Sequence, residues 1–157
     1  MSDLKHLSTA WDVDRTIVLE DDKVVAVRFS RNETCLDNSD ELAYENYLLT
    51  AQMDASLSQI ATKVRNFCAI YAVDVNKVTD FDEMYELGDL REPFGLIFFF
   101  RNKRIQVDLS TGNNNKINFV VDPADLIDII ELVYRGGQKG HGLVRGIKKF
   151  NHVAVAR

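Results

Sequence analysis

The chain has 157 residues, of which 46% are hydrophobic, and a formal net charge of −5. That length predicts one domain with a sizeable core, and its apolar runs are far shorter than the ~20 residues that cross a bilayer. The first residues lack the basic-then-apolar pattern of a secretion signal. We therefore expect an intracellular protein that does not enter a membrane and keeps its two cysteines, Cys35 and Cys68, as thiols.

The charge is unevenly distributed along the chain. Residues 135–157 contain six Lys or Arg and no Asp or Glu, so the preceding residues carry the other 13 basic residues and all 24 acidic ones. An acidic body with a basic C-terminal segment indicates that this segment contacts a polyanion or an acidic partner. On charge alone, a merely solvated tail is an equally good interpretation.

The first predicted elements are a helix, a strand and a second helix. Ser8 predicts the cap of the first helix, and residues 23–30 are β-branched and aromatic, which predicts a buried strand. Asn38 and Glu41, three residues apart, resemble a capping box for the second helix. The apolar pattern of this helix exceeds the usual ~8–20 residues, so an irregular segment is predicted near residues 43–52.

Apolar runs separated by polar turns dominate the second half of the chain. The predicted elements are, in order, a strand at 67–75, a short helix at 79–87, a hairpin of strands at 95–101 and 104–109, and a helix that starts at Asp122–Pro123 and ends at Gly136–Gly137.

This order of elements predicts the fold class. Two strands joined through a helix run parallel with a right-handed crossover, and the hairpin adds antiparallel strands to the same sheet. The result is an α/β, thioredoxin-like arrangement with a mixed four-stranded central sheet and helices on both faces. One domain is predicted at residues 1–143, followed by a basic C-terminal tail at 144–157.

Cys35 lies where a thioredoxin-like fold would carry out redox chemistry. In a Cys-x-x-Cys at this position, the helix N-terminus acidifies the first thiol and the second thiol resolves the mixed disulfide. The residue three after Cys35 is Asn38, so the resolving thiol is absent. Cys68 lies in an apolar strand, where cysteine behaves as a small hydrophobe, and spacing cannot establish a bridge between the two. A thiol–disulfide oxidoreductase using Cys35 is kept only as the alternative function.

The sequence contains no other recognisable catalytic constellation. His6, His141 and His152 lie near the chain ends without a partner at metal-ligand spacing, and no phosphate-binding loop occurs. We predict that the protein is not an enzyme and binds no metal and no cofactor.

Two polar loops and the basic end of the last helix supply the candidate partner-binding residues. Their amides and cations suit contacts with protein backbone or phosphate, while solvated structural turns are the competing interpretation, because Asn favours tight turns. The candidates are Arg101, Lys103, Arg104, Asn113, Asn114, Asn115, Lys116, Arg135 and Lys139.

Several stretches resemble the Dim/Dib family, the small thioredoxin-like subunit of the spliceosomal U4/U6.U5 tri-snRNP. The resemblance is carried by IATKVRNFCAIY at 60–71, DFDEMYEL at 80–87, FFFRNK at 98–103 and TGNNNKIN at 111–118. It implies a non-catalytic component of the U5 snRNP and tri-snRNP, needed for pre-mRNA splicing in the nucleus. The implied partners are large tri-snRNP proteins, with U6 RNA and the 5′ splice site nearby, and the protein is expected to be a monomer outside the complex.

The chain departs from the family pattern at three places. An insertion is predicted around residues 36–52, and the sequence after Val144 diverges. Near Leu90–Pro93 the family often has a cysteine that could pair with the counterpart of Cys35, whereas this chain has Phe94, so that disulfide is not expected. The isomer of the Glu92–Pro93 bond and direct contact with RNA are left open, although a pI near 5.2 argues against an autonomous RNA binder.

Overall fold

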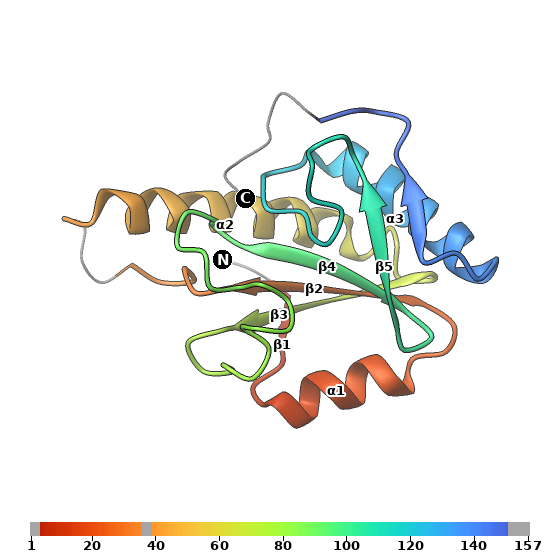
Figure 1. Cartoon of the computed structure of the whole chain (residues 1–157), viewed down its shortest axis with the longest axis horizontal. Helices are drawn as coiled ribbons and strands as arrows, with labels where there is room; N and C mark the ends of the chain where they lie inside the picture. Colours follow the sequence, from red (N-terminus) through yellow and green to blue (C-terminus); the bar gives the residue numbers. More distant parts are fainter. Residues whose placement is uncertain (1–3, 36–38, 151–157) are drawn as a thin grey trace.

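A mixed sheet of six strands, in the order β1-β3-β2-β4-β5-β6, organises the protein. The computed structural model describes residues 4–35 and 39–150. Helix α1 covers one face of the sheet, and α2 and α3 cover the other (Figure 1). The elements are β1 Lys5–His6, α1 Ala10–Leu19, β2 Val24–Ser30, α2 Glu41–Ala61, β3 Cys68–Asp74, β4 Gly95–Phe100, β5 Lys103–Asp108, α3 Pro123–Gln138 and β6 Leu143–Arg145.

The pairing of the central strands confirms the predicted α/β class and mixed sheet. Strand β2 lies between β3, to which it is parallel, and β4, to which it is antiparallel. Strand β5 returns beside β4 as the predicted hairpin. The structure adds two short strands that the sequence analysis missed: β1 pairs with β3, and β6 pairs with β5. None of the helices in the described residues is long and apolar enough to span a membrane.

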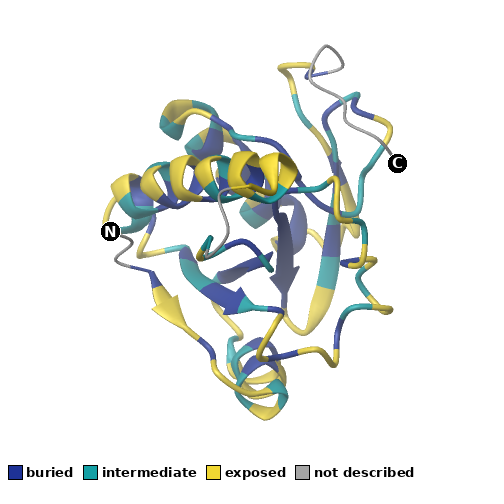
Figure 2. Ribbon diagram, turned by 90° about the vertical axis from the view of Figure 1, so that its left-hand side faces the viewer, coloured by how far each residue is buried: buried dark blue, intermediate teal, exposed yellow. Residues whose placement is uncertain are grey.

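Two apolar layers, one on each face of the sheet, form the core. The period of two along β2 turns Val24 and Ala26 toward α2 and α3, and Val25, Val27 and Phe29 toward α1. Figure 2 shows the buried strands between the helices. The largest buried apolar side chains on the α2–α3 side include Met53, Leu57, Leu96, Phe98, Leu126 and Ile130.

The N-termini of the first two helices differ from those predicted. Helix α1 is capped by Thr9, whose hydroxyl oxygen accepts a hydrogen bond from the amide of Asp12 at 3.0 Å, and not by Ser8. Helix α2 is capped by Asp40, which accepts from the amide of Ala43. Asn38, predicted as its cap, lies outside the described residues. The prediction of an irregular segment near 43–52 was wrong, because α2 is continuous through these residues.

The prediction of a short helix at 79–87 was also wrong. These residues form turns, and Glu86 has a positive φ of 57°, which a right-handed helix does not allow. Two of their aromatic rings pack on Phe29 beneath the sheet, with ring centroids 6.1 Å away for Phe81 and 5.6 Å for Tyr85. This packing holds the segment as a close-fitting loop.

Gly136 and Gly137 lie inside α3, which ends at Gln138, and so they do not terminate the helix as predicted. A Cβ on Gly136 would overlap the side chain of Val144, and one on Gly137 would lie 2.7 Å from the Phe100 ring. The two glycines therefore let α3 approach β4 and β6 closely. Val144 is buried within β6, so the domain boundary predicted at 143/144 falls inside a strand of the sheet.

Candidate functional site

The position of a thioredoxin-like redox centre is the loop from the end of β2 to the start of α2. Cys35 is half-buried in this loop, and the residue three positions later lies outside the described chain. Neither cysteine takes part in a disulfide within the part of the chain that the structure describes. Burial in an apolar environment raises the pKa of the Cys68 thiol, which keeps it protonated and unreactive.

A buried ionic group, here called the Arg28 cluster, lies just behind this loop and consists of Arg28, Asp54, Glu33 and His6. Arg28 is fully buried and donates from Nε and Nη2 to the two carboxylate oxygens of Asp54, both at 2.8 Å. Its Nη2 also lies 2.7 Å from Glu33, which in turn contacts the His6 ring at 2.9 Å. Burial by itself would lower the pKa of the Arg28 guanidinium, but the opposing effect of the Asp54 and Glu33 carboxylates is larger. The pKa of Arg28 is therefore raised above its ordinary value.

A second buried group fixes the segment before β4. The carbonyl oxygen of Pro93 accepts hydrogen bonds from Ser30, Asn32 and Thr50 at 2.9–3.0 Å. The side chain of Asn46 donates to the carbonyl of Leu90. The described residues contain no cis peptide bond, so Glu92–Pro93 is trans. The polar side chains of Asn46 and Thr50 on α2 are thus buried against this segment.

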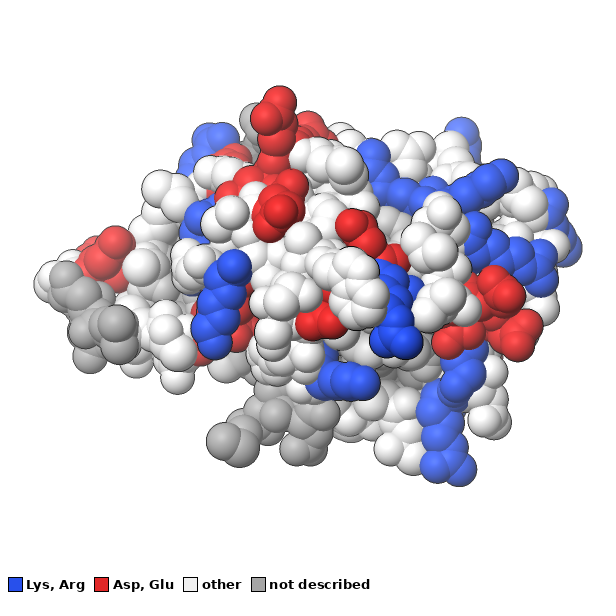
Figure 3. Space-filling view, turned by 90° about the horizontal axis from the view of Figure 1, so that it is seen from below, with Lys and Arg blue, Asp and Glu red and all other residues white. Residues whose placement is uncertain are grey.

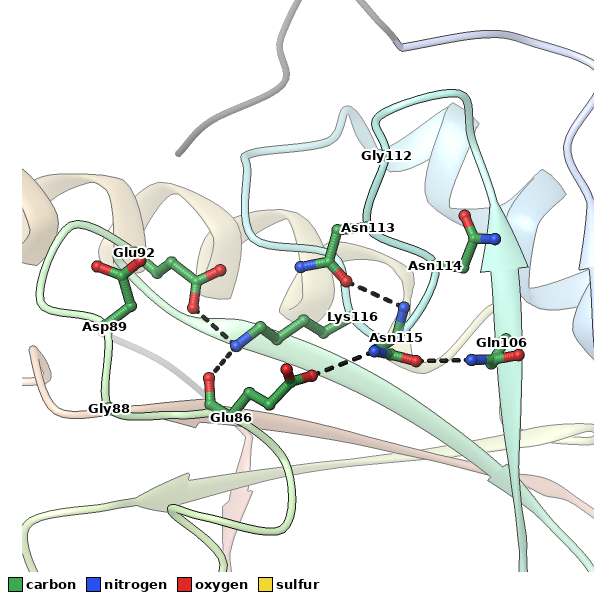
Figure 4. A pocket seen from close by; sticks show the side chains of 10 residues that line it. All are labelled: Glu86, Gly88, Asp89, Glu92, Gln106, Gly112, Asn113, Asn114, Asn115 and Lys116. Carbon is green, nitrogen blue, oxygen red and sulfur yellow. Dashed lines mark hydrogen bonds and ion pairs between the residues drawn. The ribbon is translucent and has the colours of Figure 1, made fainter. Parts of the chain in front are cut away.

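Lys116, a predicted contact residue, is buried and serves the internal structure. Its ammonium forms an ion pair with Glu92 at 2.7 Å and donates to the carbonyl oxygen of Glu86 (Figure 4). Asn118 donates to the other carboxylate oxygen of Glu92. The loop that carries Lys116 is therefore fastened to the segment 85–92, and its ammonium is not presented to a partner.

Asn113, Asn114 and Asn115 line a cleft of about 580 Å³ between these two segments. The side-chain nitrogen of Asn115 donates to Glu86 at 3.2 Å, and its side-chain oxygen accepts from Gln106 at 2.6 Å. The backbone amide of Asn115 donates to the side-chain oxygen of Asn113 (Figure 4). Two of the three asparagines thus shape the loop, as the structural interpretation predicts. Glu86, Asp89 and Glu92 supply the acidic groups of the same cleft.

Four of the predicted basic residues lie at one end of the molecule. Arg101 and Asn102 both have positive φ, which gives the tight hairpin turn its geometry and leaves Arg101 and Lys103 exposed. Gly137 brings the end of α3, with exposed Arg135 and Lys139, against Phe100 just before this turn. The hairpin turn after β4 and the end of α3 both lie on the right in Figure 1, and on the right of Figure 3 Lys and Arg side chains surround a smaller acidic group. We call Arg101, Lys103, Arg135 and Lys139 the basic end.

Arg104 takes a different direction from its neighbours. It pairs across the sheet with Phe99, and its guanidinium lies 5.6 Å from the centroid of the Tyr85 ring, on the α1 side. The structure therefore divides the predicted residues into the basic end, Arg104 on the other face, and the loop of the cleft.

The Arg28 cluster and the acidic side of the cleft are the features that the sequence analysis missed. An arginine within an otherwise apolar strand was the available signal, since a buried guanidinium requires an acidic partner. Asp54, between the buried Met53 and Leu57, is the matching acidic residue. In the described residues, no group of three or more His, Cys, Asp or Glu is placed to hold a metal ion.

Solved structures with a similar chain path include thioredoxins. The thioredoxin of Fasciola hepatica superposes with a TM-score of 0.54 at 13% identity, covering 82% of this chain and 97% of that one. Chloroplastic thioredoxin z gives 0.56 at 14% identity, covering 85% and 96%. The fold is therefore thioredoxin-like, as predicted.

Sequence comparison places the chain within that class. The family model of the mitosis protein DIM1 matches residues 3–150. The spliceosomal protein DIB1 of Saccharomyces cerevisiae is 43% identical over 98% of this chain and 96% of its own length. The mitosis protein dim1 of Schizosaccharomyces pombe is 42% identical over 94% of each. The chain belongs to the DIM1 family, which confirms the resemblance seen in the sequence.

Proposed function

We propose that this protein is a structural component of the spliceosome, belonging to the U5 snRNP and the U4/U6.U5 tri-snRNP, and is needed for pre-mRNA splicing in the nucleus. The observation that carries the proposal is 43% identity, over nearly the full length of both chains, to a relative named as a spliceosomal protein. Its partners are large proteins of the particle, with spliceosomal RNA nearby. Outside the particle it is a monomer.

The proposed role is that of a non-catalytic scaffold. Two observations support it: the Cys68 thiol is buried, and the side chains next to the loop that carries Cys35 are engaged in the Arg28 cluster and in the Pro93 hydrogen bonds. An oxidoreductase would need a second accessible thiol near Cys35, and the sequence supplies none at the required spacing.

Affinity purification of the tagged, full-length protein from nuclear extract tests the assignment. We expect U4, U5 and U6 RNAs to be enriched over an untagged extract, because a component of the tri-snRNP remains with the RNAs of the particle at physiological salt. Sequencing of the co-purified RNA gives the measurement. A soluble, folded protein that brings down none of these RNAs would show that this family member has a different function.

Exposed cations of the basic end are proposed to contact partners. Replacing Arg101 and Lys103 with glutamate should lower the yield of co-purified U RNAs at least about fivefold, because reversing charges at a contact surface opposes association. Lys5 and Lys77 are exposed lysines elsewhere, so Lys5→Glu with Lys77→Glu is the matched control and should leave the yield unchanged. Equal yields from both double variants would remove the basic end from the contact surface.

A further inference from the structure

The cleft between segments 85–92 and 111–116 has a lining that suits one class of ligand. Its volume of about 580 Å³ lies within the ~300–1,000 Å³ typical of binding pockets. Three carboxylates and one lysine line it, together with the side-chain amides of Gln106 and the three asparagines (Figure 4). We propose that this cleft binds the guanidinium group of an arginine side chain presented by a partner protein.

The charges that line the cleft favour a cation. Lys116 and Glu92 neutralise each other at its floor, where both side chains are less than one-tenth exposed. Asp89 is paired with Arg91 at 2.9 Å, so Glu86 carries the one carboxylate of the lining that no cation among the described residues pairs with. Because protein walls reduce screening by water, an unpaired carboxylate in a cleft attracts a cation more strongly than the same group on an open surface.

The Glu86 carboxylate is held in place by its own backbone. Glu86 has a φ of 57°, a left-handed conformation that is strained for a non-glycine residue. The ammonium of Lys116 fixes its carbonyl oxygen, and Asn115 donates to one of its carboxylate oxygens at 3.2 Å. The second carboxylate oxygen is left as an acceptor for a ligand. Its neighbour Asp89 is oriented by hydrogen bonds from Arg91, whose side chain is 60% exposed.

The cleft also offers a neutral acceptor and open space. The side-chain amide of Asn114 makes no hydrogen bond to any residue that the structure describes, and Figure 4 shows no contact to it from the other lining residues. Gly88 and Gly112 leave the walls without side chains, and a Cβ built on Gly88 would meet nothing within 4 Å. A planar side chain can therefore enter between the two loops without displacing a packed group.

These acceptors fit a guanidinium better than a phosphate. Guanidinium is planar and presents five N–H donors in a fixed fork that matches carboxylate and amide oxygens. Lys116 is the one cation among the described lining residues, and it is already paired with Glu92. An RNA phosphate entering the cleft would face the unpaired Glu86 carboxylate, and the two neighbouring cations, Lys116 and Arg91, already hold Glu92 and Asp89. The inference thus deepens the proposed scaffold role and rests on it for the identity of the partner.

Binding can be measured on the purified full-length protein without any spliceosomal component. The probe is the peptide acetyl-Gly-Gly-Arg-Gly-Gly-amide, titrated into ¹⁵N-labelled protein at physiological salt and followed by amide chemical shifts. We expect shifts confined to residues 86–92 and 112–116. The same peptide with citrulline, which has the shape of arginine without its charge, should bind at least tenfold more weakly.

Two sets of variants locate the site. Glu86→Gln should weaken arginine-peptide binding about tenfold, because it removes the unpaired carboxylate of the cleft, and Gly88→Leu should abolish it by filling the cleft. Gly142→Leu is the matched control, because a Cβ at this exposed glycine also meets nothing within 4 Å and Gly142 does not line the cleft. It should bind like the unaltered protein. The amide spectrum of each variant shows that it is folded.

The proposal is overturned by equal binding of the arginine and citrulline peptides, by shifts scattered over other acidic surfaces, or by unchanged affinity in the cleft variants. Shifts at the cleft on adding a single-stranded RNA oligonucleotide in place of the peptide would also overturn it. If the peptide does not bind but U RNAs are enriched, the arginine site is disproved and the proposed spliceosomal function stands. If the peptide binds specifically but no U RNA is enriched, the spliceosomal assignment is disproved and the arginine site stands.

Discussion

Asp54→Ala is expected to lower the free energy of unfolding by about 3–5 kcal/mol, the range found when one partner of a buried ion pair is removed. Arg28 is fully buried and uses two of its nitrogens on the Asp54 carboxylate. Without Asp54 the guanidinium retains Glu33 as its acidic partner, and two of its charge-assisted hydrogen bonds are lost. Urea denaturation followed by circular dichroism measures the loss.

Two controls separate the ion pair from the packing of α2. Arg28→Met combined with Asp54→Leu removes both charges and fills the space with apolar atoms, so it should lose much less stability than Asp54→Ala. Gln59→Ala changes an exposed position of the same helix and should stay within about 0.5 kcal/mol of the unaltered protein. A cost below about 1 kcal/mol for Asp54→Ala would contradict a structural role of the pair.

Lys116→Met is expected to destabilise the fold by about 3 kcal/mol or more, by the same reasoning. The methionine keeps much of the apolar stem but leaves the Glu92 carboxylate, which is 9% exposed, with only Asn118 as a hydrogen-bond donor among the described residues. The carbonyl oxygen of Glu86 also loses its ammonium partner. Thermal unfolding measured by circular dichroism should show a clearly lower midpoint temperature.

Lys103→Met is the comparison for this change, because Lys103 is exposed and should shift the free energy of unfolding by no more than about 0.5 kcal/mol. Adding Glu92→Gln to Lys116→Met removes the uncompensated carboxylate and should recover part of the loss. If Lys116→Met and Lys103→Met were equally stable, Lys116 would not be fastening the two segments. With the expected result, a defect in assembly caused by a Lys116 variant reports on folding and not on a partner contact.

The central strands could be predicted because each carries its own signal. Strand β4 is a continuous apolar run, and β2 and β3 are largely apolar, as strands covered on both faces require. Strands β1 and β6 have two and three residues, and they are defined by backbone pairing with a neighbour rather than by a side-chain pattern. Such pairing depends on the tertiary structure and produces no recognisable pattern in the local sequence.

The errors along the chain have a shared physical cause. In α2, Asn46, Thr50 and Asp54 are buried, so the stripe that faces the protein is partly polar and the apolar pattern does not describe it. At 136–137, two glycines that resemble a helix stop are required by the close approach of Val144 and Phe100. In both places, contacts between residues distant in sequence override the local preference.

The candidate site was only partly predictable for a related reason. Exposure of Arg101 and Lys103 follows from a polar pair between two strands, which is a local feature. The cleft requires segment 85–92 to meet segment 111–116, and Lys116 is the residue that joins them. A basic residue in an asparagine-rich loop gives no indication that its partner is a glutamate 24 residues earlier.

The short outer strands also protect the sheet. The longer strands β3 and β5 would each expose a row of unpaired amides and carbonyls, which invites pairing with another chain. Strand β1 covers part of the edge of β3, and β6 covers part of the edge of β5, with Gly142 and Gly146 continuing the hydrogen bonds beyond β6. These two small elements, absent from the predicted fold, therefore provide a safeguard against aggregation through the sheet edges.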